Sequence, residues 1–521
     1  MRKAVVAKSA PWWMITIGVI ILIMEKCWFD SVFEYTQLKK SFNFGCGKRN
    51  TIHSIVCVNR MNISNTISFV WNLIPKPDPD KSYWFKGELP TLRGTVVGIS
   101  DVFSTIHPNY LLVAGTFVFA FFILYIKMQY PFWNQVPAYH VYDWHRRFYG
   151  NPYIINAFPK KTKYYEREPI IATSRFQDIS VENRNELTRL LQNHYFPSDR
   201  VFCSIQLVDL EAQNRSSILS TFNRVEEQIE TSGNKIEKTT SASRIEGFIT
   251  SRPVNISVAK NDNGKKERLI ILEPAEYIDT ICFDKTAATL KNARCLFSTH
   301  EYNQRFLRPD NKISLFKKEV DLIGALVPLV QYEASSFYMR QRTETRPFPK
   351  SWQLVRIQRE HLNYLQDFMD RVASLKDPAG FKVSATMEIG EITTLLHTNQ
   401  MFVYALRGTM DAVYALYFFR NPHMKYDDLE GADTLHFFMA FRNTDDFELF
   451  FAGFIWALRE ARKAMPEAKM LMMDDIGHSR PIVERWISTH DIVLRTPCAY
   501  YLTNYVVPGM PFSAGEALVI A

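Results

Sequence analysis

The chain ends in an apolar run instead of a polar tail, and this ending limits how the last segment can fold. Leu518, Val519 and Ile520 come directly before the final residue, Ala521. Burying these side chains carries the α-carboxylate of Ala521 into the protein, where an unpaired charge is costly unless a site uses it. The ending therefore predicts either a last strand docked in a sheet or a terminal carboxylate that acts as a catalytic group.

Length, charge and cysteine content restrict the class of protein. A chain of 521 residues is long enough for two or three domains with full cores. Its net charge of +8 is scattered, without the basic stripe that nucleic-acid binding needs, so nucleic acid is excluded as a partner. The cysteines show no CxxC spacing, which predicts no metal site. Cys203, Cys282 and Cys295 are expected to be reduced core residues.

Two apolar runs near the N-terminus predict membrane association. Trp12–Met24 has 13 residues and Tyr110–Ile126 has 17, whereas a bilayer core needs roughly 20 helical residues. We take 12–28 and 108–127 as the candidate spans. Basic residues before the first and after the second predict that both ends are cytosolic and that the intervening loop 29–107 is not, although that loop carries Lys and Arg of its own.

The non-cytosolic loop holds further signals. Asn62 begins the sequence Asn-Ile-Ser, a glycosylation acceptor, and Cys46 and Cys57 could pair if the loop faces an oxidising compartment. The prediction is a membrane protein, single-pass or multi-pass, whose catalytic region lies in the cytosol.

The membrane region comprises residues 1–128. The pattern of the residues that follow it predicts two similar α+β units, 129–345 and 346–521. Hydrophobic periodicity distinguishes strands from helices, and Ser180 is a plausible helix N-cap. The stretch 229–244 is the most loop-like. The expected elements of the first unit are strands at 169–173, 201–210, 244–251, 254–260, 269–283, 312–316 and 325–332 and helices at 181–195 and 287–306. Those of the second unit are helices at 356–373, 447–465 and 480–487 and strands at 381–387, 401–406, 410–420, 434–442 and 469–473.

Several motifs resemble one family in their order along the chain. The ending, Tyr-Tyr-Leu-Thr-Asn-Tyr at 500–505 and Gly-Glu-Ala-Leu-Val-Ile-Ala at 515–521, closely resembles that of eukaryotic N-myristoyltransferases. Weaker matches lie at 131–137, 186–195 and 246–256. The resemblance covers residues 130–521 and implies two tandem acetyltransferase (GNAT)-like lobes that form an N-myristoyltransferase-type fold. Thr299–Arg305 and Tyr417–Arg420 are similar to the versions encoded by large DNA viruses.

The resemblance implies an activity and a set of residues. A fatty acyl group, myristoyl being expected, passes from acyl-CoA to the N-terminal glycine amine of peptides and proteins. In the family the C-terminal carboxylate is the general base, here that of Ala521, and two backbone N–H groups hold the oxyanion, here those of Thr280 and Ile281. Acyl-CoA is a co-substrate, and no cofactor is expected to be bound permanently.

The same resemblance places CoA between an aromatic motif and the loop before a helix. Backbone N–H groups and basic side chains of that loop cradle the phosphates. The family's loop is rich in Arg and Lys, whereas Ala287, Ala288 and Leu290 occupy part of it here, which implies weaker CoA binding. The expected CoA-binding residues are Pro131, Phe132, Trp133, Ile281, Cys282, Phe283, Lys285, Thr289, Lys291, Asn292 and Ala293.

Alternatives remain open beside this interpretation. The chain could be a catalytically silent protein that binds acyl-CoA or lipidated peptides, or a conventional acetyltransferase. Phe132 and Trp133 could instead form an aromatic belt beside the membrane. Cys282 is a rival nucleophile, but its apolar strand should raise its thiol pKa. His300 is expected on a helix surface, and the segment 474–478 is expected to be a capped turn.

Overall fold

The computed structural model describes residues 108–143, 146, 151–196, 200–232, 235–261, 268–339, 351–374, 381–408, 412–427 and 431–521. The candidate span at 12–28, the loop 29–107 and the Cys46–Cys57 pair lie outside the described residues. Residues Pro108–Ala521 form one compact unit.

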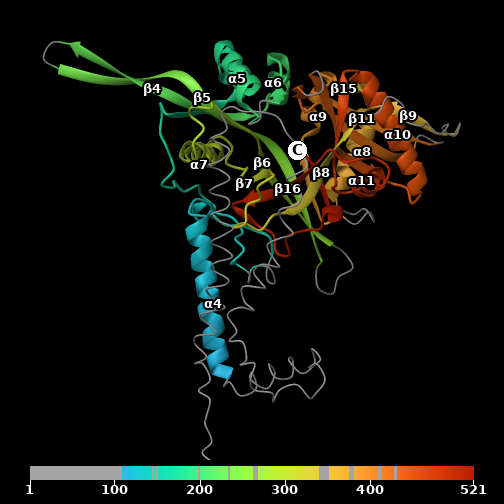
Figure 1. The fold of residues 1–521 in the computed structure, drawn as a ribbon, viewed down its shortest axis with the longest axis horizontal. Helices are drawn as coiled ribbons and strands as arrows, with labels where there is room; N and C mark the ends of the chain where they lie inside the picture. Colours follow the sequence, from blue (N-terminus) through green and yellow to red (C-terminus); the bar gives the residue numbers. More distant parts are fainter. Residues whose placement is uncertain are drawn as a thin grey trace, which may run out of the picture. The chain divides into compact units, whose positions relative to one another are not determined.

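This unit is a mixed α/β structure (Figure 1). Its helices are α4 (Pro108–Gln129), α5 (Val181–His194), α6 (Leu207–Gln213), α7 (Leu290–Leu307), α8 (Leu362–Ser374), α9 (Ile389–His397), α10 (Phe447–Ala464) and α11 (Ser479–Ile487). Its strands are β1 (Tyr153–Ile154), β2 (Ile171–Arg175), β3 (Val201–Cys203), β4 (Ile218–Ser232), β5 (Lys235–Asn261), β6 (Arg268–Phe283), β7 (Ile313–Glu319), β8 (Val330–Tyr338), β9 (Gln353–Arg356), β10 (Val383–Met387), β11 (Met401–Arg407), β12 (Val413–Arg420), β13 (Met424–Tyr426), β14 (Ala432–Arg442), β15 (Ala468–Asp474), β16 (Leu494–Thr503), β17 (Tyr505–Val506) and β18 (Ala517–Ile520).

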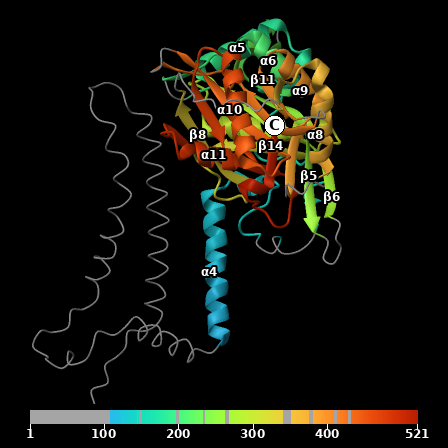
Figure 2. The same cartoon turned by 90° about the vertical axis from the view of Figure 1, so that its right-hand side faces the viewer.

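One sheet runs through both expected units. Its main path is β18-β10-β5-β6-β7-β16-β8-β15-β14-β12-β11-β9. The C-terminal strand β18 pairs in parallel with β10, and β10 pairs antiparallel with β5. Strands from the end of the chain thus complete a sheet begun by the first half, and both views place the C-terminus among the strands (Figures 1 and 2). The expected boundary between residues 345 and 346 stays a prediction.

Helix α10 shows how the sequence builds the second half. The Asp446 carboxylate caps it by accepting from the backbone N–H of Leu449 at 3.0 Å. Apolar residues on one face of the helix pack onto β11, β12 and β14. At Gly453 the helix lies so close to the sheet that the Tyr417 hydroxyl donates to the carbonyl of Phe450 at 2.7 Å. A side chain at Gly453 would occupy the space of that hydroxyl.

The predicted elements are mostly confirmed, with informative exceptions. Helix α5 starts after Ser180, whose hydroxyl accepts from the N–H of Asn183 as expected. The strand expected at 201–210 is wrong after Cys203, because the Asp209 carboxylate accepts from the N–H of Gln206 and helps α6 begin. The loop expected at 229–244 is wrong, because backbone pairing continues β4 and β5 through most of it. Helix α9 was not predicted.

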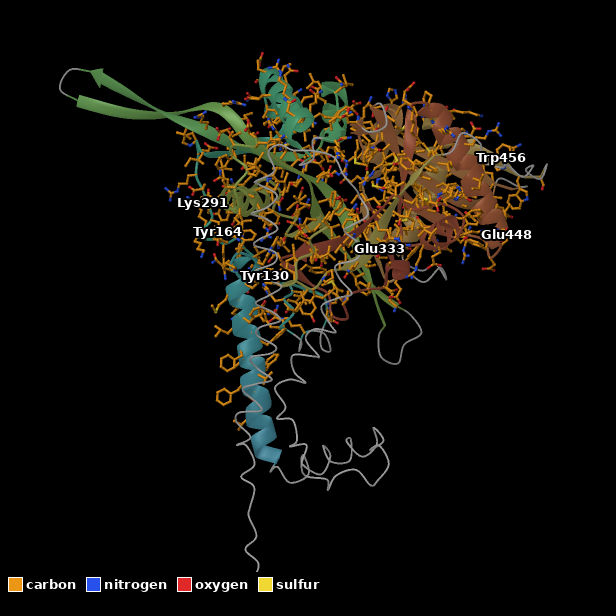
Figure 3. All side chains as sticks on the ribbon, viewed as in Figure 1. Tyr130, Tyr164, Lys291, Glu333, Glu448 and Trp456 are labelled. Atoms are coloured by element: carbon orange, nitrogen blue, oxygen red, sulfur yellow. The ribbon has the colours of Figure 1, made fainter. Side chains whose placement is uncertain are left out.

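Helix α4 covers the second candidate span, 108–127. Val113, Phe117, Phe121, Phe122 and Leu124 are between 46% and 62% exposed, and aromatic side chains project from the helix (Figure 3). Its last turn is anchored, because Ile126 is buried in the core. In the part of the chain that the structure describes, no helix combines the length and the apolar character that crossing a membrane requires.

Candidate active site

The C-terminal strand is buried, as predicted. All four residues of β18 are buried between neighbouring elements, and Ala521 itself is 3% exposed. The backbone fixes the approach to the strand: Gly477 donates its N–H to the carbonyl of Ala514, and Lys382 donates its N–H to the carbonyl of Glu516, both at 2.8 Å. A terminal carboxylate placed in this way needs a charged partner.

Arg420 supplies that partner. It is the last residue of β12, and its Nη1 donates to an oxygen of Ala521 at 3.4 Å. Its Nε donates to Nδ1 of His436 on β14 at 3.0 Å. The guanidinium carbon lies 4.9 Å from the centre of the Phe438 ring, so an aromatic face covers the charge. One arginine therefore connects the end of the chain to a histidine in the sheet.

His436 and Asp474 form a buried pair behind Arg420. Nε2 of His436 lies 3.2 Å from Oδ1 of Asp474, and both side chains are at most 4% exposed. Burial lowers the pKa of His436 to about 4, although Asp474 opposes the shift. Burial works against ionisation of Asp474 too, but His436, Lys317 and Arg420 together hold its pKa below the usual range. At neutral pH the histidine is neutral and the aspartate is charged.

Lys317 is the second cation of this region. It lies on β7, and its Nζ is 2.7 Å from Oε1 of Glu319. Burial opposes its charge, yet Asp474 and Glu319 raise the pKa of Lys317 well above the ordinary value. The Tyr332 hydroxyl lies beside this group and donates to Oδ2 of Asp474 at 3.3 Å. We call Ala521, Arg420, His436, Asp474 and Lys317 the C-terminal cluster.

Tyr277 links the C-terminal cluster to β6, the strand that carries the expected oxyanion groups. Its ring centre lies 6.4 Å from that of Tyr500. Burial, Tyr500 and Asp279 raise the pKa of Tyr277 well above its ordinary value, while Lys317 and Arg420 lower it. Tyr277 is therefore within electrostatic reach of the arginine that contacts Ala521.

The end of β6 is irregular where it pairs with β5. Thr280 pairs with Thr250 but Ile278 pairs with Ser251, which leaves Asp279 as an extra residue. The parallel pairing of β6 with β7 stops at Ile278. Thr280 and Ile281 thus lie beyond the last pair, and the Ile281 side chain is 42% exposed. Their role as oxyanion donors stays a prediction.

The start of α7 differs from the expected phosphate cradle. The Thr289 hydroxyl caps the helix by accepting from the N–H of Asn292 at 3.2 Å. The N–H of Ala293 donates to the carbonyl of Thr289, and that of Thr289 to the carbonyl of Ala287. The backbone N–H groups of Thr289, Asn292 and Ala293, three of the expected CoA-binding residues, are therefore used within the turn. Lys291, labelled in Figure 3, is exposed, as is Lys285.

The aromatic motif packs into the first half of the unit. Phe132 is buried, and its ring meets the rings of Trp133 at 4.9 Å and Phe297 at 6.0 Å. Trp133 stacks on Phe316 with ring centres 5.6 Å apart. Pro131 is exposed. The pair therefore belongs to the core that α7 and β7 share, and Phe283 at the end of β6 packs against the same core.

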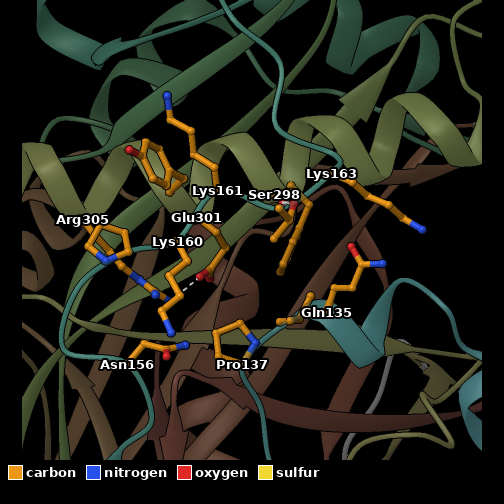
Figure 4. Close-up of a pocket in the computed structure, with 14 residues that line it drawn as sticks. Gln135, Pro137, Asn156, Lys160, Lys161, Lys163, Ser298, Glu301 and Arg305 are labelled. Atoms are coloured by element: carbon orange, nitrogen blue, oxygen red, sulfur yellow. Dashed lines mark hydrogen bonds and ion pairs between the residues drawn. The ribbon is translucent and has the colours of Figure 1, made fainter.

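A cavity of about 410 Å³ adjoins this motif (Figure 4). Residues 135–137 and 156–163 form one wall and the middle of α7 forms the other. Arg305 is buried there and donates to Glu301 at 2.6 Å. The cationic side chains at its surface exceed this single carboxylate, which suits an anionic ligand. They are Lys160, Lys161, Lys163 and Arg305.

The burial of Cys282 and His300 tests two further predictions made from the sequence. Cys282 is buried, its Sγ lies 3.5 Å from the carbonyl oxygen of Leu190, and burial raises its pKa to about 12, so a thiolate nucleophile is disfavoured as expected. His300 is not on a helix surface as predicted. It is fully buried, Nδ1 lies 2.8 Å from the Ser220 hydroxyl, and burial lowers its pKa to about 3. No group of metal-binding side chains occurs among the residues described.

Sequence reasoning missed most of the C-terminal cluster. Asp474 was expected in a turn, but it ends β15 and faces His436. The available signal was charge in apolar strands: Arg420 ends the run Tyr-Phe-Phe-Arg, and His436 lies within Leu-His-Phe-Phe. Buried charges need partners. Arg420, His436 and Asp474 in three apolar strands of one sheet therefore point to a shared site.

Comparison with known proteins identifies the fold. No family model matches the chain, and no curated protein matches its sequence. Two solved structures of Saccharomyces cerevisiae N-myristoyltransferase with bound myristoyl-CoA are similar at 12% sequence identity. They superimpose with TM-scores of 0.53 and 0.52, over 74% of this chain and 89% and 94% of theirs. The described part of this chain has the fold of N-myristoyltransferase.

Proposed function

We propose that this protein is an N-acyltransferase that moves a fatty acyl group from acyl-CoA to the N-terminal glycine amine of a peptide or protein. The observation that carries the proposal is the buried terminal carboxylate of Ala521 beside Arg420. On this fold a buried chain end is expensive unless its charge is used. The chemistry that uses it is removal of a proton from an ammonium group.

The proposed reaction needs no covalent enzyme intermediate. The carboxylate of Ala521 takes a proton from the glycine ammonium, whose reference pKa of roughly 7.7 to 8.0 makes the transfer accessible. The free amine attacks the thioester carbon, and the backbone N–H groups of Thr280 and Ile281 hold the oxyanion. The C–N bond forms, the C–S bond breaks, and the second amine proton passes to the departing CoA sulfur, which leaves as a thiol.

Myristoyl-CoA is the proposed donor. The similar yeast structures were solved with bound myristoyl-CoA, and the aromatic motif of Phe132 and Trp133 lies against α7 here. The exposed cations Lys285 and Lys291 and the lysines of the neighbouring cavity offer positive charge to the CoA phosphates. CoA enters and leaves as a substrate, so no permanent cofactor is proposed.

The deciding experiment incubates the full chain with myristoyl-CoA and a peptide that begins with glycine, and measures the peptide mass and the released CoA thiol. A matched peptide with an acetylated glycine amine is the control and should stay unmodified. Truncation after Leu518 should abolish transfer. A chain extended by one glycine after Ala521 keeps β18 and displaces only the carboxylate, and it should lose at least 100-fold in kcat. Full activity of the extended chain would refute the proposal.

A silent binding protein is the second candidate, and one observation favours it. The turn before α7 uses the N–H groups of Thr289, Asn292 and Ala293 internally and presents few cations. Binding of myristoyl-CoA with no turnover in the experiment above would support this function. A preference for acetyl-CoA would support a conventional acetyltransferase instead.

We also propose that the protein associates with a membrane, with its catalytic region in the cytosol. The support is the set of exposed apolar side chains on α4, among them Phe117, Phe121 and Phe122. The full chain should float with phosphatidylcholine vesicles, and replacing these three residues by serine should release at least part of it. If both proteins stay in the unbound fraction, α4 does not bind lipid.

A further inference from the structure

The C-terminal cluster contains a histidine–aspartate pair that resembles a catalytic dyad but whose histidine is fully buried. An arginine can only donate hydrogen bonds, so Nδ1 of His436 must be the acceptor in its contact with Nε of Arg420. A neutral His436 then carries its proton on Nε2, which faces Asp474 at 3.2 Å. Nδ1 is occupied by Arg420, Nε2 lies close to Asp474 without making a hydrogen bond to it, and the whole His436 side chain is buried. It is poorly placed to take a proton from a substrate.

The contacts instead form a chain that ends at the terminus. The Tyr332 hydroxyl donates to Asp474, Asp474 faces His436, His436 accepts from Arg420, and Arg420 donates to Ala521. Each member comes from a different strand: β8, β15, β14, β12 and the residue after β18. The sheet therefore brings five distant segments to one polar path.

We propose that Arg420 is a positioning residue that holds the carboxylate of Ala521 in its ionised form and in a fixed direction, and that the His436–Asp474 pair acts through Arg420 by fixing the guanidinium. This inference rests on the proposed function, because it describes how the proposed base is held. The new element is the assignment of the pair to orientation instead of proton transfer.

Electrostatics explain the role of each residue in this chain of contacts. A carboxylate as buried as that of Ala521 would tend to protonate, and a nearby guanidinium opposes this. A base must be unprotonated before it can act, so the contact keeps it ready. The neutral ring of His436 separates Arg420 from the carboxylate of Asp474, so that Arg420 can point Nη1 at the terminus. Lys317, from β7, offers Asp474 a separate cation. Tyr277 and Tyr500 are further titratable groups within reach of Arg420.

The test measures the pKa of the terminal carboxylate directly, by ¹³C NMR of the full chain labelled with [1-¹³C]alanine. Among the labelled groups only the terminal carboxylate titrates, and a chain in which Ala521 is replaced by glycine identifies its signal. The substitution Arg420→Met should raise this pKa by about 1 unit or more, because an adjacent cation lowers a carboxyl pKa by about 1 to 3 units. The acid limb of the pH profile of kcat should move in the same direction. Arg420→Lys keeps the charge and should keep most of the pKa effect, while its single ammonium cannot reach both His436 and Ala521.

Two substitutions of His436 separate positioning from proton transfer. His436→Asn retains an oxygen acceptor near the place of Nδ1, whereas His436→Leu fills similar space without an acceptor. We expect the Asn variant to lie closer to the wild type than the Leu variant, both in the carboxylate pKa and in kcat. Equal inactivation of both, with the carboxylate pKa unchanged, would show that His436 itself accepts the proton and would overturn the proposal.

The failures of this inference and of the proposed function are distinguishable. An unchanged carboxylate pKa in folded Arg420→Met, with folding checked by circular dichroism, overturns the positioning role whatever the activity. A raised pKa in a chain that never transfers an acyl group supports the contact between Arg420 and Ala521 and refutes only the proposed function.

Discussion

The C-terminal cluster and the start of α7 are both expected to serve acyl transfer, yet they are built in opposite ways. In the cluster, charged and polar side chains lie in the sheet and face one another, as His436 and Asp474 do at 3.2 Å. At the start of α7 the cations Lys285 and Lys291 are exposed, and the turn satisfies its own backbone groups through Thr289. One region is organised before any ligand arrives, and the other presents exposed charges to solvent.

This difference predicts that the C-terminal cluster contributes to folding stability and catalysis, whereas the start of α7 contributes only to ligand binding. Buried charges are expensive and hold their geometry only as a set, so a change in one member disturbs the others. Exposed charges interact weakly because water and salt screen them. We therefore expect substitutions in the cluster to alter stability and catalysis together, and substitutions at the start of α7 to alter only the apparent affinity for CoA.

Asp474→Asn should give the largest loss of stability. The change keeps the shape of the side chain but leaves Lys317 and Arg420 with less compensating negative charge in the protein. Removing one partner of a buried charge network costs about 3 to 5 kcal/mol. The free energy of unfolding in urea measures the effect. Glu484→Gln is the matched control, because it removes one partner of an exposed ion pair with Arg480 and should cost less than about 1 kcal/mol. Similar losses in the two variants would contradict the contrast drawn here.

Much of the fold could be predicted from the sequence because local signals agree with the final structure. Ser180 and the apolar face after it predict α5, and the apolar ending predicts a buried β18. The predictions failed where local composition and tertiary context disagree. The polar stretch 229–244 continues β4 and β5 because a two-stranded ribbon needs backbone pairing but no apolar face.

The candidate site was only partly predictable for a related reason. Ala521 and the irregular end of β6 can be located along one segment of the chain. Arg420, His436 and Asp474 come from three strands whose neighbours are set by the sheet order, which no local pattern contains. His300 looked like a surface residue because its helix is polar overall, and only its contact with Ser220 shows that it faces β4.

The pH dependence of stability gives the next prediction. Burial lowers the pKa of His300 to about 3, against an unfolded value of about 6.5. Below about pH 6.5 the unfolded chain binds a proton that folded His300 does not, so this residue lowers stability as the pH falls towards about 3. Between pH 6.5 and 5 the loss is about 1.6 kcal/mol. His300→Asn removes this titrating group. Its free energy of unfolding in urea, relative to that of the wild type, should therefore rise by the same amount between pH 6.5 and 5. A constant difference between the two proteins would show that burial does not lower the pKa of His300.

A smaller effect is expected where a turn supports the C-terminal strand. Gly477 has a φ of +59°, and a Cβ there would lie 3.0 Å from the carbonyl oxygen of Ala517. Gly477→Ala should therefore cost about 1 to 2 kcal/mol, through backbone strain and displacement of the start of β18. Gly515→Ala is the control, because nothing lies within 4 Å of its added Cβ and its φ is not in the left-handed region. Thermal unfolding of both variants checks the difference. Equal melting temperatures would show that β18 adjusts freely.

The smallest effect should come from the exposed region. Lys291→Ala removes a solvent-exposed cation at the first turn of α7, so we expect the KM for myristoyl-CoA to rise only about two- to fivefold, within the roughly 1 kcal/mol of an exposed charge pair. The rise should shrink as salt increases, because screening already weakens the lost interaction. Lys463→Ala on α10, also exposed, is the control and should leave KM unchanged.

Lys160→Ala tests the cavity beside the aromatic motif. A larger rise in KM from this substitution than from Lys291→Ala would place the CoA phosphates at that cavity instead of at the start of α7. A loss of 100-fold or more from Lys291→Ala would mean that this loop is as highly organised as the C-terminal cluster, which would remove the distinction between the two regions.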